Sequence, residues 1–289
     1  MEHFLEQFDD DFRQIPEYNV SIDKQNYDIE TLKKIFSCID LTSLNTDDRY
    51  SSIELFCAKV RDFRSHFTDI PNVAAVCTYS KYAIVQKRVL GETDVKRAVV
   101  TAGFPSSQTI IQNKIDETRN AIFDGATEID FVICVGEFFD KKYESVCSDI
   151  YAMKVHTKAE KRKVILETGM LNTPENIWNA SLLAMEAEAN FIKTSTGKHS
   201  VSATPEAVWI MAHAIKAFDA KKGTKTGIKP SGGIVTVEDA MLYWSIVEKV
   251  LGEKYLEKNF FRFGASKLAN NILTEIERLR GNTRDVRYF

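Results

Sequence analysis

Residues 190–198 read NFIKTSTGK, residues 202–218 read SATPEAVWIMAHAIKAF, and residues 226–233 read TGIKPSGG. The first and last segments contain short apolar runs that predict strands, whereas the middle one spaces apolar residues three and four apart and predicts a helix. Thr204 and Pro205 indicate where that helix begins, since Thr is a capping residue and Pro needs no partner for an N–H group. The stretch is therefore one strand, helix, strand unit, and each strand ends in a lysine beside a glycine-containing turn.

The same alternation recurs along the chain. Short runs rich in β-branched residues start about 24 to 36 residues apart, the length of one strand and helix with their loops. We predict eight strands, at Cys38–Thr42, Val73–Tyr79, Arg97–Ala102, Glu128–Ile133, Lys163–Thr168, Asn190–Thr196, Thr226–Pro230 and Phe260–Gly264. The segments between them predict helices at Ile53–His66, Ser107–Asp124, Tyr143–Ala159, Pro174–Ala187, Pro205–Phe218 and Val237–Leu251.

Eight strand and helix units favour a closed (β/α)8 TIM barrel, because the predicted strands are too apolar to leave one face in water. An open doubly wound sheet is the alternative fold. We expect one domain over residues 1–289, with a helical lead-in at 1–36, the barrel at 37–270, and a C-terminal helix and tail at 271–289. Within the lead-in, the amphipathic segment IETLKKIF (29–36) could close the bottom of the barrel.

The composition excludes several classes of protein. Lys and Arg number 38 against 41 Asp and Glu, so the net charge is −3, and no basic cluster indicates a nucleic-acid partner. The start MEHFLEQFDDDF is acidic where a signal or transit peptide is basic, and no run of about 18 apolar residues indicates a membrane helix. The 5 cysteines are scattered without a CxxC motif, which predicts neither a disulfide framework nor a cysteine-based zinc site. We therefore expect a cytoplasmic protein with no membrane partner.

Ionisable residues stand where barrel strands should be apolar. They are Asp40, Asp130, Glu167, Lys193 and Lys229, each flanked by apolar residues of its own strand. The chemistry of a barrel lies at the C-terminal ends of its strands, and a closed barrel has no exposed edge on which a charge could be solvated. We therefore expect these side chains inside the barrel, with Glu167 either touching the site or paired with one of its lysines.

The two lysines in this set, Lys193 and Lys229, predict amine chemistry. A lysine with its ordinary pKa of about 10.4 is neutral in roughly one molecule in 2,500 at pH 7, so it needs burial or a neighbouring cation to become a nucleophile. Lys193 and Lys229 lie on successive predicted strands and could supply that cation to each other. Asp130 then either partners an ammonium and carries protons, or forms a structural ion pair with one of the lysines.

Glycine-rich turns follow the same strands and indicate a phosphate site. Gly197 and Lys198 follow the first lysine strand, Gly232 and Gly233 follow the second, and the last predicted strand ends in the sequence FGAS. Glycines let backbone N–H groups approach an anion, and helix N-termini after strands seven and eight are the usual phosphate cup of barrels. We therefore expect a small phosphorylated substrate.

The segments CIDLT, TEIDFVI, FIKTSTGK, SATPE, GIKPSGGI and FRFGAS together resemble the deoxyribose-phosphate aldolases, which are class I (Schiff-base) aldolases. The resemblance runs in order over most of the chain, and FIKTSTGK is its most specific motif. It implies reversible cleavage of 2-deoxy-D-ribose 5-phosphate to acetaldehyde and D-glyceraldehyde 3-phosphate on a TIM barrel, with no metal and no cofactor. A lyase of deoxyribonucleotide catabolism follows from it.

The resemblance also implies residue roles. Lys193 is the Schiff-base lysine, Lys229 is the cation that lowers the pKa of Lys193, and Asp130 is the proton-relay acid. The implied substrate-binding residues are Gly197, Lys198, Gly232, Gly233, Gly264 and Ser266 for the phosphate, and Asp40, Thr42 and Thr196 for the sugar hydroxyls.

The chain departs from the family pattern at several positions. Lys267 stands where the family often has a second serine. The chain ends in Tyr288 and Phe289, whereas some members end in a tyrosine that assists catalysis, so we leave the tail outside the site. Cys77 matches a family cysteine near the pocket, and we interpret it as a core residue.

Other functions stay open at this stage. A pyridoxal-phosphate enzyme also needs a lysine imine and a phosphate cup, and it would be yellow. A sugar-phosphate sensor would bind anions through the same lysines in a salt-dependent way without forming an imine. Class I aldolases with other donors differ only in details of the pocket. The sequence is silent on oligomeric state; barrel enzymes are often dimers, so a homodimer is one arrangement that stays open.

Overall fold

The computed structural model describes residues 1–22 and 27–289. Its centre is one sheet of parallel strands in the order β7-β6-β5-β4-β3-β2-β1-β8. Parallel bridges from Ile228 to Phe261 and from Ser231 to Gly264 join the two ends and close the barrel. The strands are β1 (Ile39–Thr42), β2 (Ala75–Tyr79), β3 (Lys96–Val100), β4 (Glu128–Val132), β5 (Lys161–Ile165), β6 (Phe191–Lys193), β7 (Gly227–Lys229) and β8 (Phe263–Ala265).

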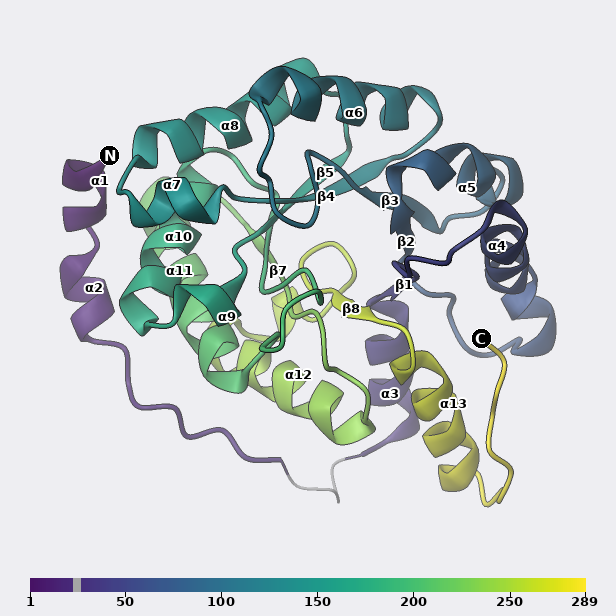
Figure 1. The fold of residues 1–289 in the computed structure, drawn as a ribbon. Coiled ribbons are helices and arrows are strands. Elements are labelled where there is room, and N and C mark those ends of the chain that lie inside the picture. The colour runs from purple at the N-terminus through teal and green to yellow at the C-terminus, as the bar shows by residue number, and fades with distance from the viewer. Residues whose placement is uncertain (23–26) are drawn as a thin grey trace.

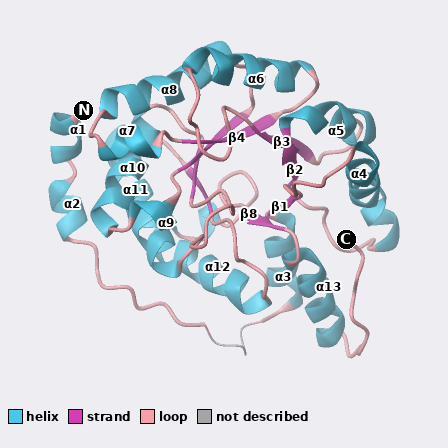
Figure 2. Ribbon diagram, in the orientation of Figure 1, coloured by secondary structure: helices cyan, strands magenta, loops and turns pink. Residues whose placement is uncertain are grey.

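Helices surround the strands in an outer ring (Figures 1 and 2). Hydroxyl caps begin three of them: Thr173, Thr204 and Thr236 each accept a hydrogen bond from a backbone N–H of the first helical turn. The ring consists of α4 (Tyr50–His66), α5 (Ala83–Leu90), α6 (Ile111–Phe123), α8 (Tyr143–His156), α10 (Pro174–Glu186), α11 (Pro205–Lys222), α12 (Val237–Leu251) and α13 (Leu268–Leu279). Shorter helical segments lie in the loops: η2 (Ser80–Tyr82), α7 (Val135–Phe139), α9 (Thr168–Leu171) and η3 (Glu253–Tyr255).

The barrel prediction is confirmed, and the differences lie at element ends and in one helix that was not predicted. The predicted strand 163–168 ends at Ile165, because the backbone of Glu167 is left-handed, with φ 57°, and leads into α9. The predicted helix 107–124 begins only at Ile111, since Ser107 also has a positive φ, of 60°. Helix α5 lies in a segment for which no helix was predicted. None of the helices among the described residues is both long and apolar enough to cross a membrane.

The lead-in is helical only in parts. Helices α1 (Glu2–Glu6) and α2 (Asp9–Arg13) precede an irregular segment, residues 23–26 lie outside the described residues, and α3 (Ile29–Ser37) follows. The first segment lies along the outer ring, where the Phe12 and Trp178 rings are 5.5 Å apart and Trp209 donates a hydrogen bond to the Pro16 carbonyl. Helix α3 packs beside α13 in the ring (Figure 1), and its residues Lys34 and Ser37 line a hollow at the N-terminal ends of the strands. Closure of the barrel bottom by this segment stays a prediction.

The tail also packs on the outer ring. Asn270 of α13 accepts hydrogen bonds from the backbone N–H groups of Tyr288 and Phe289, and the Tyr288 hydroxyl donates to the Lys59 carbonyl of α4 at 2.8 Å. The Phe289 ring stacks on Phe63 of α4, with centroids 5.7 Å apart. In this conformation the tail lies between α4 and α13 and away from the barrel interior.

The barrel interior has two different halves. Residues paired in register on parallel strands share one face of the sheet, and successive residues alternate between faces. On β2 and β3 the interior residues are small and apolar, and they form one cluster with a loop residue and two partly buried rings: Leu44, Ala75, Cys77, Ala98 and Val100, with Tyr79 and Phe104. In register beside this cluster, Asp40 pairs with Ala75 and Asp130 pairs with Val100, which places the first charges of the second half.

Candidate active site

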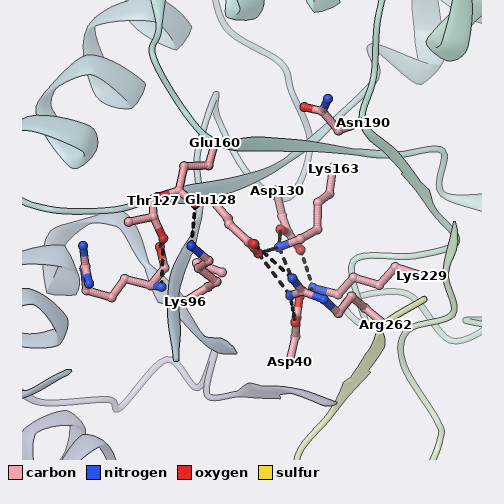
Figure 3. Close-up of polar contacts among 12 residues, drawn as sticks. Asp40, Lys96, Thr127, Glu128, Asp130, Glu160, Lys163, Asn190, Lys229 and Arg262 are labelled. Atoms are coloured by element: carbon pink, nitrogen blue, oxygen red, sulfur yellow. Dashed lines mark hydrogen bonds and ion pairs between the residues drawn. The ribbon is translucent and has the colours of Figure 1, made fainter. Parts of the chain in front are cut away.

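A buried network of charges fills the second half of the interior. Its members are all at most 2% exposed: Asp40 on β1, Glu128 and Asp130 on β4, Lys163 on β5, Lys193 on β6, Lys229 on β7, and Arg262 just before β8. Figure 3 shows six of them converging from different strands toward one another. Since an unpaired buried charge is very costly, the close packing of opposite charges is what permits their burial.

Asp130 lies at the centre of this network and contacts three lysines. Its Oδ1 is 3.0 Å from Lys163 Nζ, and its Oδ2 is 2.8 Å from Lys193 Nζ and 2.7 Å from Lys229 Nζ. Lys193 and Lys229 thus share one carboxylate oxygen, and their paired positions on β6 and β7 place them side by side. The structure brings together the three residues that the sequence assigned to catalysis.

The cations differ in how many carboxylates hold them. Lys163 contacts three, with Nζ 2.7 Å from Glu128 and 3.1 Å from Asp40 in addition to Asp130. Lys229 contacts Asp130 and, at 2.5 Å, Asp40. Arg262 contacts Asp40 at 2.5 Å and Glu128 at 3.0 Å. Among the described residues, Lys193 contacts one carboxylate, and it shares that oxygen with another ammonium.

This difference in partners separates the pKa values of the lysines. Burial lowers the pKa of Lys193, the nearby Lys229 ammonium lowers it further, and the opposing effect of Asp130 does not restore it. Burial also acts against the charge of Lys163 and Lys229, but their several carboxylates raise the pKa of both. The same cations hold the pKa of Asp130 well below its ordinary value. Lys193 is therefore the lysine of the network that most readily loses its proton.

A glycine-lined cavity opens at the C-terminal ends of the strands, with a volume of about 280 Å³. It is lined by eight of the predicted substrate-binding residues, Thr42, Thr196, Gly197, Lys198, Gly232, Gly233, Gly264 and Ser266, and also by Leu44, Asn45, Ser231, Ile234, Val235, Ala265 and Lys267. A larger hollow of about 550 Å³ lies at the opposite end of the barrel. That hollow contains none of the predicted residues, so its size does not make it the candidate site.

Close backbone approach explains two of the glycines. A Cβ on Gly232 would lie 2.6 Å from Ser202 Oγ, and one on Gly264 would lie 2.5 Å from Ser231 Oγ. The same Cβ on Gly264 would also lie 3.2 Å from Lys229 Cε. Gly264 is thus the point at which the cavity meets the charged network.

Asp40 differs from expectation, and the structure decides between the two alternatives for Glu167. Asp40 does not line the cavity, because both of its carboxylate oxygens are occupied by cations of the network. Glu167 forms no ion pair with a network lysine among the described residues. Instead its Oε2 accepts a hydrogen bond from the Thr196 hydroxyl at 2.5 Å, and its Oε1 accepts one from the Thr196 backbone N–H at 3.2 Å. Glu167 therefore fixes a wall residue of the cavity.

The sequence analysis missed three members of the network, Glu128, Lys163 and Arg262. Two of them could have been predicted from the rule that residues two apart on a strand lie on the same face of the sheet. Glu128 precedes Asp130 by two positions and so shares its face, and Arg262 precedes Gly264 by two. Lys163 pairs in register with Asp130 across β4 and β5, which is visible only once the sheet is assembled.

Cys77 lies in the apolar cluster. It is fully buried, and burial raises the pKa of its thiol. The thiol is therefore protonated at neutral pH, which agrees with its interpretation as a core residue.

The (β/α)8 fold, the buried lysines and the glycine-lined cavity fit a barrel lyase of the aldolase class. The model of the DeoC/LacD family aldolases matches residues 35–253, and the chain belongs to this family. It is 36% identical to the deoxyribose-phosphate aldolase of Bos taurus over 263 residues, covering 88% of this chain and 83% of the relative. It is 39% identical to that of Agrobacterium fabrum over 238 residues, covering 82% and 88%. A solved structure from Coccidioides immitis has a TM-score of 0.75 at 25% identity and covers 95% of this chain and 97% of that one.

Proposed function

We propose that the protein cleaves 2-deoxy-D-ribose 5-phosphate reversibly to acetaldehyde and D-glyceraldehyde 3-phosphate through an imine on Lys193. The observation that carries the proposal is the position of Lys193, which is buried at the end of β6 with one shared carboxylate partner among the described residues, and the turn that follows β6 lines the glycine-containing cavity. The names of the relatives supply the substrate. A homodimer remains part of the proposal as a prediction.

In the cleavage direction, the neutral amine of Lys193 attacks C1 of the open-chain aldehyde and loses water to give the imine. The protonated imine then serves as the electron sink. A water held by Asp130 takes the proton of the C3 hydroxyl, the C2–C3 bond breaks, and its electron pair moves into the imine. Glyceraldehyde 3-phosphate leaves, and an enamine of acetaldehyde remains on the lysine.

The cycle closes by proton return and hydrolysis. Protonation of the enamine at C2 restores the imine, and water releases acetaldehyde and the neutral amine. Lys229 keeps a positive charge beside Lys193, since its own pKa is raised by Asp130 and Asp40. That charge favours the neutral form of Lys193 for the next turnover. Because the imine accepts the electrons, this sequence of steps uses neither a metal nor a cofactor.

The phosphate is assigned to the cavity formed by the turns after β6, β7 and β8. Gly197, Gly232 and Gly233 have φ angles of 75°, 83° and 78°, which side chains with a Cβ rarely adopt. Such turns can direct backbone N–H groups at an anion. Lys198 and Lys267 line the same cavity and add positive charge.

A coupled assay tests the reaction. Release of glyceraldehyde 3-phosphate from 2-deoxy-D-ribose 5-phosphate is measured with a metal chelator present, and turnover is expected. Absence of turnover with chelator, together with recovery on adding a divalent metal, would contradict the metal-free route. Binding of sugar phosphate without any turnover would favour the sensor, and yellow protein that loses activity with its colour would favour a pyridoxal-phosphate enzyme.

Imine trapping tests the nucleophile. Acetaldehyde and a borohydride reagent are expected to add a stable ethyl group to Lys193, located by mass spectrometry of its peptide. Lys193→Arg keeps a cation but is expected to abolish trapping and to lower kcat by more than about 10³-fold, since the covalent route is lost. Lys258→Ala removes an exposed lysine and serves as the matched control with unchanged labelling. Full activity in Lys193→Arg would refute the assignment.

A further inference from the structure

We propose that Glu128, Lys163 and Arg262 are positioning residues that set the number of protons in the barrel interior, so that the uncharged amine is that of Lys193. This inference rests on the imine mechanism proposed above and adds a role for three residues that lie outside the cavity. None of the three is among the residues that line it. Lys193 and Asp130 do not line it either, but among the described residues none of the three contacts Lys193, so their influence on its amine must pass through the charges that they touch.

Glu128 joins the three residues, because it contacts both Lys163 and Arg262. Arg262 NH1 and NH2 lie 3.1 and 3.0 Å from the two oxygens of Glu128, and Arg262 NH1 also donates to Asp40. Lys163 Nζ is 2.7 Å from Glu128 Oε2 and reaches both aspartates as well. Figure 3 shows these contacts as a continuous chain from Glu128 to Lys229. A change of charge at Glu128 is thus felt at both aspartates that hold Lys229.

Counting charges identifies the amine that is left over. The network contains three carboxylates, Asp40, Glu128 and Asp130, and the cations Lys163, Lys229 and Arg262 each contact at least two of them. These six groups are electrically neutral together. A proton on Lys193 would add an uncompensated positive charge to a buried cluster, which is unfavourable in a medium of low polarity. The count reaches this conclusion without reference to any sequence motif.

The groups that face Lys193 come from several strands. Asp130 on β4 contacts it directly, Lys229 on β7 shares the same carboxylate oxygen, and Cys77 on β2 is an uncharged thiol at neutral pH because burial raises its pKa. Lys163 is one carboxylate further away, on the other oxygen of Asp130. The lowered pKa of Lys193 and the raised pKa values of Lys163 and Lys229 agree with the count.

The proposal predicts shifts of opposite sign. Glu128→Gln keeps the shape of the side chain and removes one negative charge, so the pKa of Lys193 should fall. Lys163→Met removes one positive charge, so the pKa of Lys193 should rise. The double variant restores the balance and should return the pKa near its original value. Each single shift should be about one pH unit, the order expected for one charge removed within a buried cluster.

The experiment measures the pH dependence of imine trapping. Wild type, both single variants and the double variant are treated with acetaldehyde and cyanoborohydride from pH 5 to 10, and labelling of Lys193 is quantified by mass spectrometry. The midpoint of the acidic limb is expected to move down in Glu128→Gln, up in Lys163→Met, and back in the double variant. One control should leave the midpoint in place: Glu160→Gln, from an exposed ion pair with Lys96 outside the network.

Several outcomes would overturn the inference: unmoved midpoints, shifts of the same sign in both single variants, or a double variant that is not restored. A merely structural role would lower the amount of folded, labelled protein and leave the midpoint unchanged. If Lys163→Met does not fold, Arg262→Gln removes the same charge from the other side of Glu128 and should also raise the midpoint. Wild type that shows no label on Lys193 at any pH would refute the proposed function, whereas labelling with unmoved midpoints refutes only this inference.

Discussion

The two halves of the barrel interior are made of the same strands and helices but differ completely in chemistry. On β2 and β3 the interior consists of small apolar residues, including Ala75, Cys77 and Ala98, whereas β4 to β8 and β1 contribute the charged network. Both halves are fully buried. Burial alone therefore does not tell packing residues from reactive residues in this barrel. The two kinds of residue differ in whether they contact charged partners.

The charged half is stable only while each buried charge keeps its partners of opposite sign. A buried ion pair gains little over apolar residues, but removing one partner leaves an uncompensated charge and typically costs about 3 to 5 kcal/mol. The apolar half follows the ordinary rule for cores, in which loss of one small group costs about 1 kcal/mol. Side-chain deletions of equal size should therefore lower the free energy of unfolding more in the charged half than in the apolar half.

The largest effect is expected at Asp130, the carboxylate that contacts three lysines. Asp130→Asn keeps the shape of the side chain and removes the group that passes protons to water. We expect kcat to fall by about 10² to 10⁴-fold, the usual value for loss of a general acid or base. Loss of a negative charge beside Lys193 does not disfavour its neutral form, so imine trapping should persist. Steady-state assays and trapping on the same sample measure the two effects.

Turnover close to wild type in Asp130→Asn would remove its role as proton carrier and leave it a structural ion pair. Loss of both turnover and trapping would mean that the lysines are no longer placed correctly. Circular dichroism of the same sample then shows whether the barrel has kept its fold.

A smaller effect is expected at Lys229, which supplies the positive charge next to Lys193. Lys229→Leu removes that charge, so the pKa of Lys193 should rise and its neutral form should appear only at higher pH. The acidic limb of the pH–rate profile should move to higher pH by about one unit, which means about tenfold lower activity below the limb. A pH profile of kcat/KM measures this shift, and an acidic limb that stays in place would remove the proposed role of Lys229.

Sequence reasoning predicted the fold because eight alternating units leave few arrangements, and it predicted Lys193, Lys229 and Asp130 because a charge within an apolar run is conspicuous. It did not predict that Asp40 lies in the network, since that depends on barrel closure bringing Arg262 beside β1. Contacts that join distant strands leave no local pattern.

Errors at element ends have a local cause. Glu167 follows an apolar run and looks like a strand residue, yet its left-handed backbone ends the strand and turns its carboxylate to Thr196. The position of the tail could not be predicted from its sequence either, because it depends on hydrogen bonds from the backbone N–H groups of Tyr288 and Phe289 to Asn270.

The smallest effect is expected in the apolar half, at Cys77. Cys77→Ala removes one buried sulfur atom and should lower the free energy of unfolding by about 1 kcal/mol, as for other small deletions in a core. The thiol has a raised pKa and carries no charge at neutral pH, so its loss should leave the charge balance of Lys193 intact. We expect kcat within about threefold of wild type and an unmoved acidic limb, because no group that titrates in the working range is lost. Urea unfolding and the pH–rate profile measure the two quantities.

Cys77 also offers a second test of the difference between the halves. Its strand partner Thr42 lines the cavity. A fall in kcat of tenfold or more with unchanged stability would place the thiol in the chemistry and extend the reactive half across β2. Alkylation gives an independent measurement: iodoacetamide should modify the partly exposed Cys134 well before the buried Cys77. Faster modification of Cys77 would mean that the apolar half opens to solvent and that its burial does not protect the imine from competing reactions.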